Sequence, residues 1–145
     1  MTEKHIPKAL MYDGLELGKF EKTYQQLILH LNKDININWL PYIFVLGYNK
    51  GTDMNKIIKA WKKDRVFPKN RYGSFKMLLQ LHMFTYDVDK IAEKTRCSLL
   101  TDPYWLVYND TDTYTNCTAR GKIGGDYYPY NSLQLENEEN YIWRI

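Results

Sequence analysis

The densest group of ionisable side chains in the sequence lies between residues 54 and 76. Eight bases stand there against one acid, a net charge of +7, while the other residues sum to −4. The bases are Lys56, Lys59, Lys62, Lys63, Arg65, Lys69, Arg71 and Lys76. Such a basic segment can bind an acidic protein surface or a nucleic acid. The net charge of the whole chain is only +3, which gives no separate support for nucleic-acid binding.

Two arginines of this segment flank Pro68, at a corner between two helical patterns. Arg65 and Arg71 can donate to the carbonyls at a helix end and to a nearby carboxylate, which would brace the corner. The alternative is that the corner recognises an anion on a partner. We expect the bracing role for the arginines. We assign partner binding to five lysines of the segment: Lys56, Lys59, Lys62, Lys63 and Lys69.

The motif "TDPYW" at residues 101–105 places two aromatic side chains after a turn. Asp102 and Pro103 are typical turn residues, and an Asp side chain can accept a hydrogen bond from the backbone two residues on. Tyr104 and Trp105 then either fill the core beneath the helices or stand exposed as interface anchors. Both are therefore candidates for partner binding alongside the lysines.

Residues suited to catalysis, cofactor binding or metal ligation are not grouped in the sequence. His5, His30 and His82 lie far apart, and the carboxylates are scattered, so no acid–base pair stands out. Cys97 and Cys117 form no disulfide framework and are expected to be reduced thiols. We therefore expect no catalytic residue, no cofactor and no metal, in a protein that is not an enzyme.

Length and composition indicate a single globular domain with its own core. The chain has 145 residues, of which 44% are hydrophobic and 26% charged, an ordinary globular balance. No apolar run approaches the roughly 18 residues of a membrane span, and the first residues lack the apolar region of a signal peptide. The sequence therefore predicts a cytoplasmic protein without a membrane partner.

Strand patterns dominate the N-terminal part of the chain. In "ALMYDGLELGKF", Asp13 and Gly14 separate two apolar stretches, which predicts a hairpin because both residue types tolerate positive φ. The segment from Thr23 is either a third strand or a short helix, and its β-rich end favours the strand. The apolar residues 39–46 are expected to be buried, with Pro41 in the first turn of a helix.

Three further helices are predicted after residue 51. The first covers residues 52–65, is capped by Thr52 or Asp53, and has an apolar stripe of Met54, Ile57, Ile58 and Trp61. The second runs from Ser74 to about Met83, with three side chains inward: Phe75, Leu78 and Leu79. The third runs from Asp87 to about Arg96, also with three inward: Val88, Ile91 and Ala92.

These elements predict an α+β fold, in which an N-terminal antiparallel hairpin or small sheet precedes three to four helices and an irregular C-terminal segment. Residues 1–108 are expected to form the single α+β domain, with a short strand after "TDPYW". Residues 109–145 are rich in turn formers. We expect them to form an irregular extension packed on the domain or on a partner.

The order of these segments resembles the small N-terminal subdomain of HipA-family kinases over roughly residues 8–108. The likeness lies in the hairpin "MYDGLELGKFEK", the proline-containing "NWLPYIF", the helix end "WKKDRVFPKNR" and the later "YDVDKIAEKTRCSLLTDPYW". The metal-binding and catalytic-loop motifs of the family have no counterpart in the sequence. In three-part toxin–antitoxin systems of this kind, a separate small protein resembles this subdomain and restrains the kinase.

The resemblance implies a non-catalytic regulatory module that binds another protein, such as a HipA-like kinase. The first alternative is an inhibitor of host defence from a phage or mobile element, with a host defence protein as its partner. The second is a nucleic-acid-binding protein that uses the basic residues 54–76. About eight residues separate the flanking helices where a helix-turn-helix needs three or four, so that motif is not predicted.

Overall fold

The computed structural model describes residues 6–121 of the chain, whose N-terminal part is an antiparallel sheet. Strand β1 (Ala9–Tyr12) pairs with β2 (Leu15–Lys22), and Asp13 adopts a φ of 46° in the turn between them. Because Asp tolerates this left-handed conformation, the predicted hairpin forms. Strand β3 (Leu27–Leu31) pairs antiparallel with β2, which confirms the predicted third strand.

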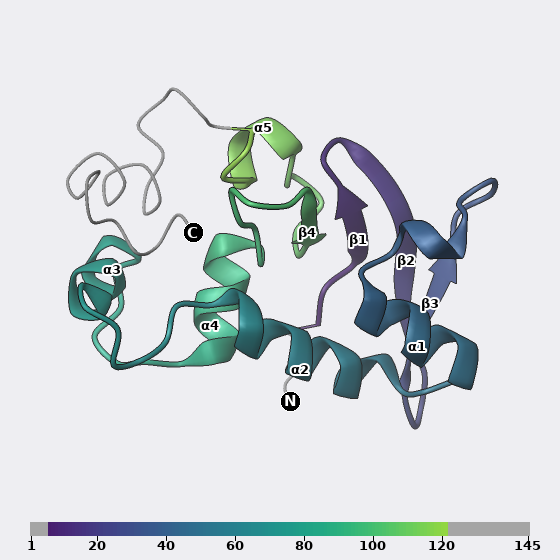
Figure 1. Cartoon of the computed structure of the whole chain (residues 1–145), viewed down its shortest axis with the longest axis horizontal. Helices are drawn as coiled ribbons and strands as arrows, with labels where there is room; N and C mark the ends of the chain where they lie inside the picture. Colours follow the sequence, from purple (N-terminus) through teal and green to yellow (C-terminus); the bar gives the residue numbers. More distant parts are fainter. Residues whose placement is uncertain (1–5, 122–145) are drawn as a thin grey trace.

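The fourth strand comes from a distant part of the chain. β4 (Tyr104–Val107) pairs antiparallel with β1, so the strand order is β3-β2-β1-β4. The chain between β3 and β4 forms helices, and this pairing brings it back to the same sheet (Figure 1). The predicted α+β fold is confirmed.

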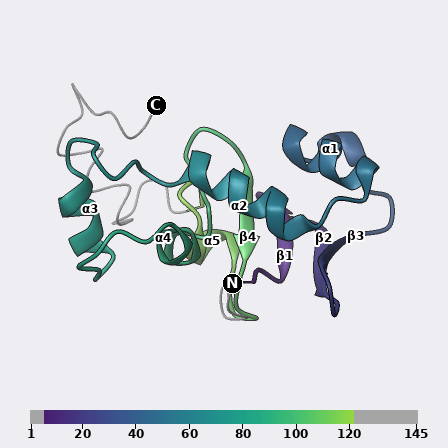
Figure 2. The same ribbon diagram turned by 90° about the horizontal axis from the view of Figure 1, so that it is seen from below.

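The helices differ in how they lie against the sheet. They are η2 (Ile37–Trp39), α1 (Tyr42–Lys50), α2 (Met54–Arg65), α3 (Ser74–Gln80), α4 (Val88–Thr95) and α5 (Tyr114–Cys117). α1 and α2 lie over one face of the sheet, and α3 lies at the opposite end of the molecule from β3 (Figures 1 and 2). Within residues 6–121, no helix has the length and apolar character needed to cross a membrane.

Helix α2 is held to the sheet at its N-terminus by Asp53. One carboxylate oxygen of Asp53 accepts the backbone N–H of Asn55 at 3.0 Å and that of Leu27 in β3 at 2.9 Å. The first bond caps the helix, and the second places the helix start against the sheet. The predicted apolar stripe is confirmed by the burial of Met54, Ile58 and Trp61.

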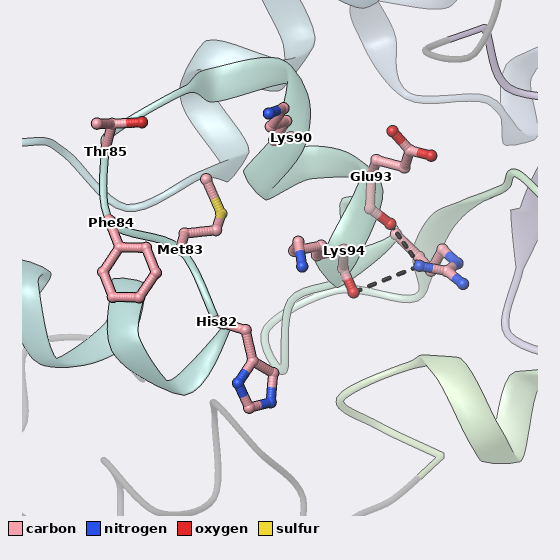
Figure 3. A pocket seen from close by; sticks show the side chains of 8 residues that line it. His82, Met83, Phe84, Thr85, Lys90, Glu93 and Lys94 are labelled. Atoms are coloured by element: carbon pink, nitrogen blue, oxygen red, sulfur yellow. Dashed lines mark hydrogen bonds between the residues drawn. The ribbon is translucent and has the colours of Figure 1, made fainter.

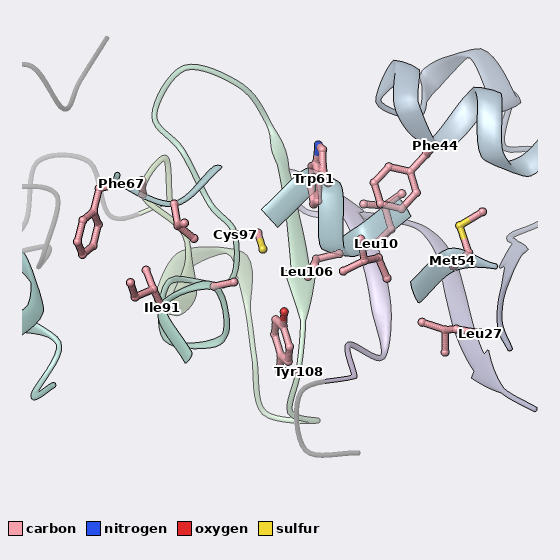
Figure 4. Close-up of a cluster of buried hydrophobic side chains, with 14 of the residues drawn as sticks. Leu10, Leu27, Phe44, Met54, Trp61, Phe67, Ile91, Cys97, Leu106 and Tyr108 are labelled. Carbon is pink, nitrogen blue, oxygen red and sulfur yellow. The ribbon is translucent and has the colours of Figure 1, made fainter. Parts of the chain in front are cut away.

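The core lies between α2 and the sheet and extends under α4 (Figure 4). Leu10 and Leu106 are fully buried on neighbouring strands. Phe44 from α1 and Trp61 from α2 meet edge to face, with ring centroids 5.1 Å apart, a geometry that aromatic pairs prefer. Ile91 continues the core beneath α4.

Two predicted burials in residues 39–46 are wrong, one in η2 and one in α1. Trp39 is 48% exposed and Leu46 is 42% exposed, although Phe44 is buried as expected. A helix that lies on a sheet buries only one side, and α1 turns Phe44 and Gly47 inward. Consecutive apolar residues point to all sides of a helix. Those that point away from the sheet therefore remain in solvent.

Helix α3 turns a different side inward from the one predicted. Leu78 is buried as expected, together with Met77, but Phe75 is 68% exposed and Leu79 is 43% exposed. Met77 and Leu78 are neighbours on one side of this short helix, whereas Phe75 and Leu79, four residues apart, lie together on another side. Only one of those sides meets the body, so the prediction for Phe75 and Leu79 is wrong.

The start of α3 also differs from the prediction that Ser74 caps it. Gly73 precedes the helix with a φ of 84°, a left-handed conformation that suits glycine. Ser74 lies inside the helix, and its hydroxyl donates to the backbone carbonyl of Pro68 at 2.6 Å. The serine therefore holds the helix to the preceding corner instead of capping it.

The turn after β4 is closed by the carboxylate of Asp112. It accepts the Arg96 guanidinium at 2.7 and 3.0 Å and the backbone N–H groups of Tyr108 and Asn109 at 2.9 and 3.0 Å. Burial alone would raise the pKa of this carboxyl, but the hydrogen bonds outweigh burial and lower the pKa to about 2. Asp112 is therefore ionised at neutral pH.

Residues 109–121 of the expected extension are held on the domain. Thr118 and Ala119 are buried, and the backbone N–H of Ala119 donates to the Ser98 hydroxyl at 2.8 Å. The rest of that extension, residues 122–145, lies outside the described residues.

Trp61→Ala is expected to lower the free energy of unfolding by about 3–5 kcal/mol, because it empties a buried site against Phe44 and Arg65. Trp39→Ala is the matched control, since Trp39 is half-exposed, and should cost less than about 1 kcal/mol. Urea unfolding of both variants measures the difference. Equal losses would show that the facing of α2 is wrong.

Asp112 is expected to make stability depend on acid pH. Its pKa is lowered on folding, so the stabilisation is complete above about pH 4 and is lost as the pH falls toward 2. Urea unfolding at several pH values should show wild type exceeding Asp112→Asn by about 2 kcal/mol at pH 6 and by much less near pH 2.5. A difference that stays constant across this range would contradict the assignment.

Candidate functional site

The lysines predicted to bind a partner occupy two different environments. Lys56, Lys59 and Lys63 are exposed on α2, and Lys69 is exposed in the turn that follows. None of the four forms an ion pair within residues 6–121, and we call them the basic surface. Positions i, i+3 and i+7 place the three helical lysines on one side of α2.

Lys62, by contrast, is fully buried, so its predicted place on the positive surface is wrong. Its Nζ donates to the Asp89 carboxylate of α4 at 3.1 Å. Lys62 stands four residues after Ile58, which puts the two on one side of the helix. Sequence periodicity showed one apolar stripe, but α2 packs against both the sheet and α4, so its buried side is wider.

Trp105 is also buried, at 1% exposure, and does not serve as an exposed interface anchor. Its indole N–H donates to the backbone carbonyl of Asp13 at 2.7 Å, which fastens the β1–β2 turn to β4. Of the two interpretations of "TDPYW", burial is confirmed for Trp105, although it lies outside the core cluster that contains Leu10 and Leu106. Tyr104 is only half-buried, at the first position of β4.

Tyr104 lines a cleft of about 470 Å³ beside the β1–β2 turn, which we call the aromatic cleft. Its lining residues come from β1, β2, β4 and the region of η2: Tyr12, Leu15, Leu17, Asn38, Trp39 and Tyr104. Three of these, Tyr12, Leu15 and Trp39, are 41%, 48% and 48% exposed. Large apolar side chains gathered in solvent around one hollow are typical of a binding surface.

The rings of Tyr12 and Tyr104 stand at right angles in the aromatic cleft. Their centroids are 5.5 Å apart and their planes meet at 86°. The Tyr104 hydroxyl donates to the backbone carbonyl of Trp39, which ties η2 to β4. Burial, followed by the neighbouring Tyr12 and Asp102, raises the pKa of Tyr104. The hydroxyl therefore stays protonated and able to donate at neutral pH.

Arg65 of α2 fixes the stretch of chain that carries Tyr104. Its guanidinium donates to both Asp102 carboxylate oxygens at 2.7 and 2.8 Å, to the Tyr104 carbonyl at 2.8 Å and to the Cys97 carbonyl at 2.7 Å. It also lies over the Trp61 ring, 4.2 Å from the centroid. Arg65 is 6% exposed, so these charge-assisted bonds are little weakened by water. Arg65 therefore makes bonds of the predicted kind, to a carboxylate and to backbone carbonyls, but they join α2 to residues 97–104 and not to the corner at Pro68.

Arg71 contributes to the same corner only through its backbone. Its N–H donates to the Pro68 carbonyl at 3.2 Å, and its carbonyl accepts the Ser74 N–H at 3.0 Å. Its side chain makes no hydrogen bond or ion pair within the part of the chain that the structure describes. The predicted bracing by the Arg71 guanidinium is therefore wrong, because the turn after Pro68 leaves that side chain partly in solvent.

The other wall of the aromatic cleft is held at the β1–β2 turn. The Asp13 N–H donates to the Pro103 carbonyl at 2.8 Å, and the Arg120 guanidinium donates to the Asp13 carboxylate at 2.9 Å. These bonds keep Tyr12 and Leu15 in place on either side of the turn. Both walls are therefore formed before any ligand binds.

A second hollow, of about 620 Å³, lies between the end of α3 and α4 (Figure 3). It is lined by His82, Met83, Phe84, Thr85, Lys90, Glu93, Lys94 and Arg96. All of these come from one continuous stretch of chain, and Arg96 is already bound to Asp112. The aromatic cleft instead unites residues from four separate segments, so we place the candidate site there.

The aromatic cleft has no histidine, cysteine, lysine or carboxylate among its six lining residues. Within residues 6–121, no three His, Cys, Asp or Glu side chains are placed to hold a metal ion. Cys97 and Cys117 are free thiols, as expected. Cys97 is fully buried, and burial raises the pKa of its thiol to about 11, so it is protonated at neutral pH. The aromatic cleft supplies contact area and hydrogen-bonding groups, which are suited to binding.

Comparisons of the chain with protein-family models, with curated proteins and with solved structures found no match. The resemblance to the HipA-family subdomain therefore stays a prediction. The function has to be argued from the residues of the chain itself.

Of the residues that line the aromatic cleft, Tyr104 was predicted from the sequence to bind a partner. Tyr12, Leu15 and Trp39 were not predicted. The hairpin contained a usable signal for the first two, since Tyr12 and Leu15 are register partners across its two-residue turn. No comparable signal marks Trp39. It reaches the cleft only because η2 is tied to β4 through the Tyr104 hydroxyl.

Arg65→Ala is expected to lower the free energy of unfolding by about 3–5 kcal/mol, because it leaves Asp102 and two backbone carbonyls without their donor. Arg65→Lys keeps the charge but lacks the planar fork, and should recover only part of this loss. Arg71→Ala is the matched control and should change stability by less than about 0.5 kcal/mol.

Urea unfolding of the three variants measures these differences. The brace would be refuted if Arg65→Ala and Arg71→Ala unfolded at the same urea concentration as the wild type.

Proposed function

We propose that this protein is a non-catalytic regulatory module that binds another protein through the aromatic cleft. The observation that carries the proposal is the gathering of Tyr12, Trp39 and Tyr104 around one hollow. Two of the three are 41% and 48% exposed. Tyrosine and tryptophan bury a large area against a partner at a small cost in side-chain entropy, which makes them frequent interface anchors.

The rigidity of the cleft supports the same function. The Arg65–Asp102 ion pair holds one wall, and the Trp105–Asp13 hydrogen bond holds the other. A surface that is already ordered loses little conformational entropy when it binds, so more of the contact energy appears as affinity.

A HipA-like kinase is the partner that the resemblance suggests, and restraint of that kinase is the regulatory act that follows. In this proposal the protein is a cytoplasmic toxin–antitoxin component without catalytic activity of its own. An inhibitor from a phage or mobile element would use the same cleft against a host defence protein. The two versions differ in the partner that binds and share the site.

The basic surface supports nucleic-acid binding as a second candidate function. Lys56, Lys59, Lys63 and Lys69 are exposed and form no ion pair within residues 6–121. Four such lysines would give binding that falls with salt, because each phosphate contact releases counterions. The same lysines would equally draw an acidic protein partner toward α2.

Trp39→Ala is expected to weaken the binding of a HipA-family kinase by about 30-fold, since truncating an aromatic anchor costs about 2 kcal/mol. Isothermal titration calorimetry with the purified proteins measures the change. Tyr24→Ala is the matched control, because Tyr24 is 96% exposed between β2 and β3 and does not line the cleft. Its loss should leave the affinity unchanged.

Equal affinity of the wild type and Trp39→Ala for the kinase would contradict binding through the aromatic cleft. Absence of kinase binding, together with DNA binding that falls between about 50 and 200 mM salt, would favour the second function. In that case replacement of the four lysines of the basic surface by glutamine should abolish DNA binding.

A further inference from the structure

We propose that the aromatic cleft receives a cationic side chain, an arginine or a lysine, from the partner protein. The inference rests on the proposed function and adds the chemistry of the bound group. Tyr12, Trp39 and Tyr104 line the cleft. The face of an aromatic ring is the negative part of its quadrupole and attracts a cation within about 6 Å of the centroid, most strongly for tryptophan.

The orientation of the two tyrosine rings suits a cation. Their planes meet at 86° with centroids 5.5 Å apart, so the rings form two sides of a corner. Trp39 lines the same hollow from η2. Several rings around one hollow form an aromatic cage, the arrangement that binds quaternary ammonium groups and methylated lysine in proteins.

The cleft has no cation of its own to repel the incoming one. None of its six lining residues is basic. Arg65 and Arg120 brace its walls, but each is bound to a carboxylate, that of Asp102 at 2.7 Å and that of Asp13 at 2.9 Å. An anionic ligand would meet the ring faces without a basic lining residue, so the chemistry of the cleft favours a cation.

The other lining residues suit the remainder of a long cationic side chain. Leu15 is 48% exposed and offers apolar contact to a methylene stem. Asn38 adds a side-chain amide, whose oxygen can accept a hydrogen bond from a guanidinium or ammonium group. The fold already uses this chemistry internally, where the Arg65 guanidinium lies 4.2 Å from the centroid of Trp61.

The proposal is tested by measuring the binding of two pairs of blocked tripeptides. Each peptide has a glycine on either side of one central residue, and only the central residue differs within a pair. One pair compares arginine with citrulline, its neutral isostere, and the other compares lysine with norleucine. Binding to the full chain and to its variants is followed by NMR through the backbone amide signals of Tyr12, Leu15 and Tyr104, which line the cleft and remain when Trp39 is replaced. We expect each charged peptide to bind about three- to thirtyfold more tightly than its neutral counterpart. Trp39→Leu should abolish this preference, and Tyr24→Leu, the matched control, should keep it.

Equal affinity of the charged and neutral peptides, or no binding by any of them, would overturn the cationic assignment. If Trp39→Ala still weakened kinase binding in that case, the proposed function would stand and the cleft would bind an apolar group. If the wild type and Trp39→Ala also bound the kinase with equal affinity, the cleft would not be the docking site, and both proposals would be wrong.

Discussion

The buried guanidinium of Arg65 joins helix α2 to the residues that lead into β4. It is 6% exposed and bonds to three groups within residues 97–104: the Asp102 carboxylate and the carbonyls of Cys97 and Tyr104. A buried charge is costly unless it is paired and fully hydrogen-bonded. Any arrangement that keeps Arg65 inside must therefore also keep α2, the turn after α4 and the start of β4 in one fixed relation.

This constraint connects the helices to the aromatic cleft. Asp102 accepts the Arg65 guanidinium and also the backbone N–H of Tyr104 at 3.0 Å. A side chain on α2 therefore sets the conformation of the residue that carries one wall of the cleft. The Arg65–Asp102 pair therefore holds Tyr104 in place at the wall of the cleft.

Helix α2 shows how packing separates side chains of one type. Lys59 and Lys63 are exposed, whereas Lys62 is fully buried and bound to Asp89 of α4. The attraction within a buried ion pair only roughly offsets the loss of hydration, so the Lys62–Asp89 pair contributes little net stability. Its effect is to specify which side of α2 faces α4. The lysines on the other side are then left as the basic surface.

Features that depend only on residues close together in the sequence could be predicted without the structure. The Asp13–Gly14 hairpin and the apolar stripe of α2 formed as predicted, and Asp53, one of the two predicted residues, caps α2, because turn geometry, capping and helical periodicity are local. The need of Arg65 for a carboxylate and carbonyl acceptors was also predictable, but the residues that supply them, Cys97, Asp102 and Tyr104, were not.

The burial of Lys62, the exposure of Trp39 and the pairing of β4 with β1 could not be predicted from the sequence and became known from the fold. Each depends on contacts between segments that are distant in the sequence, and no local pattern records which segment will arrive. The aromatic cleft belongs to this second class. Its residues come from β1, β2, η2 and β4, and they meet because β4 pairs with β1 and because Trp105 bonds to the β1–β2 turn.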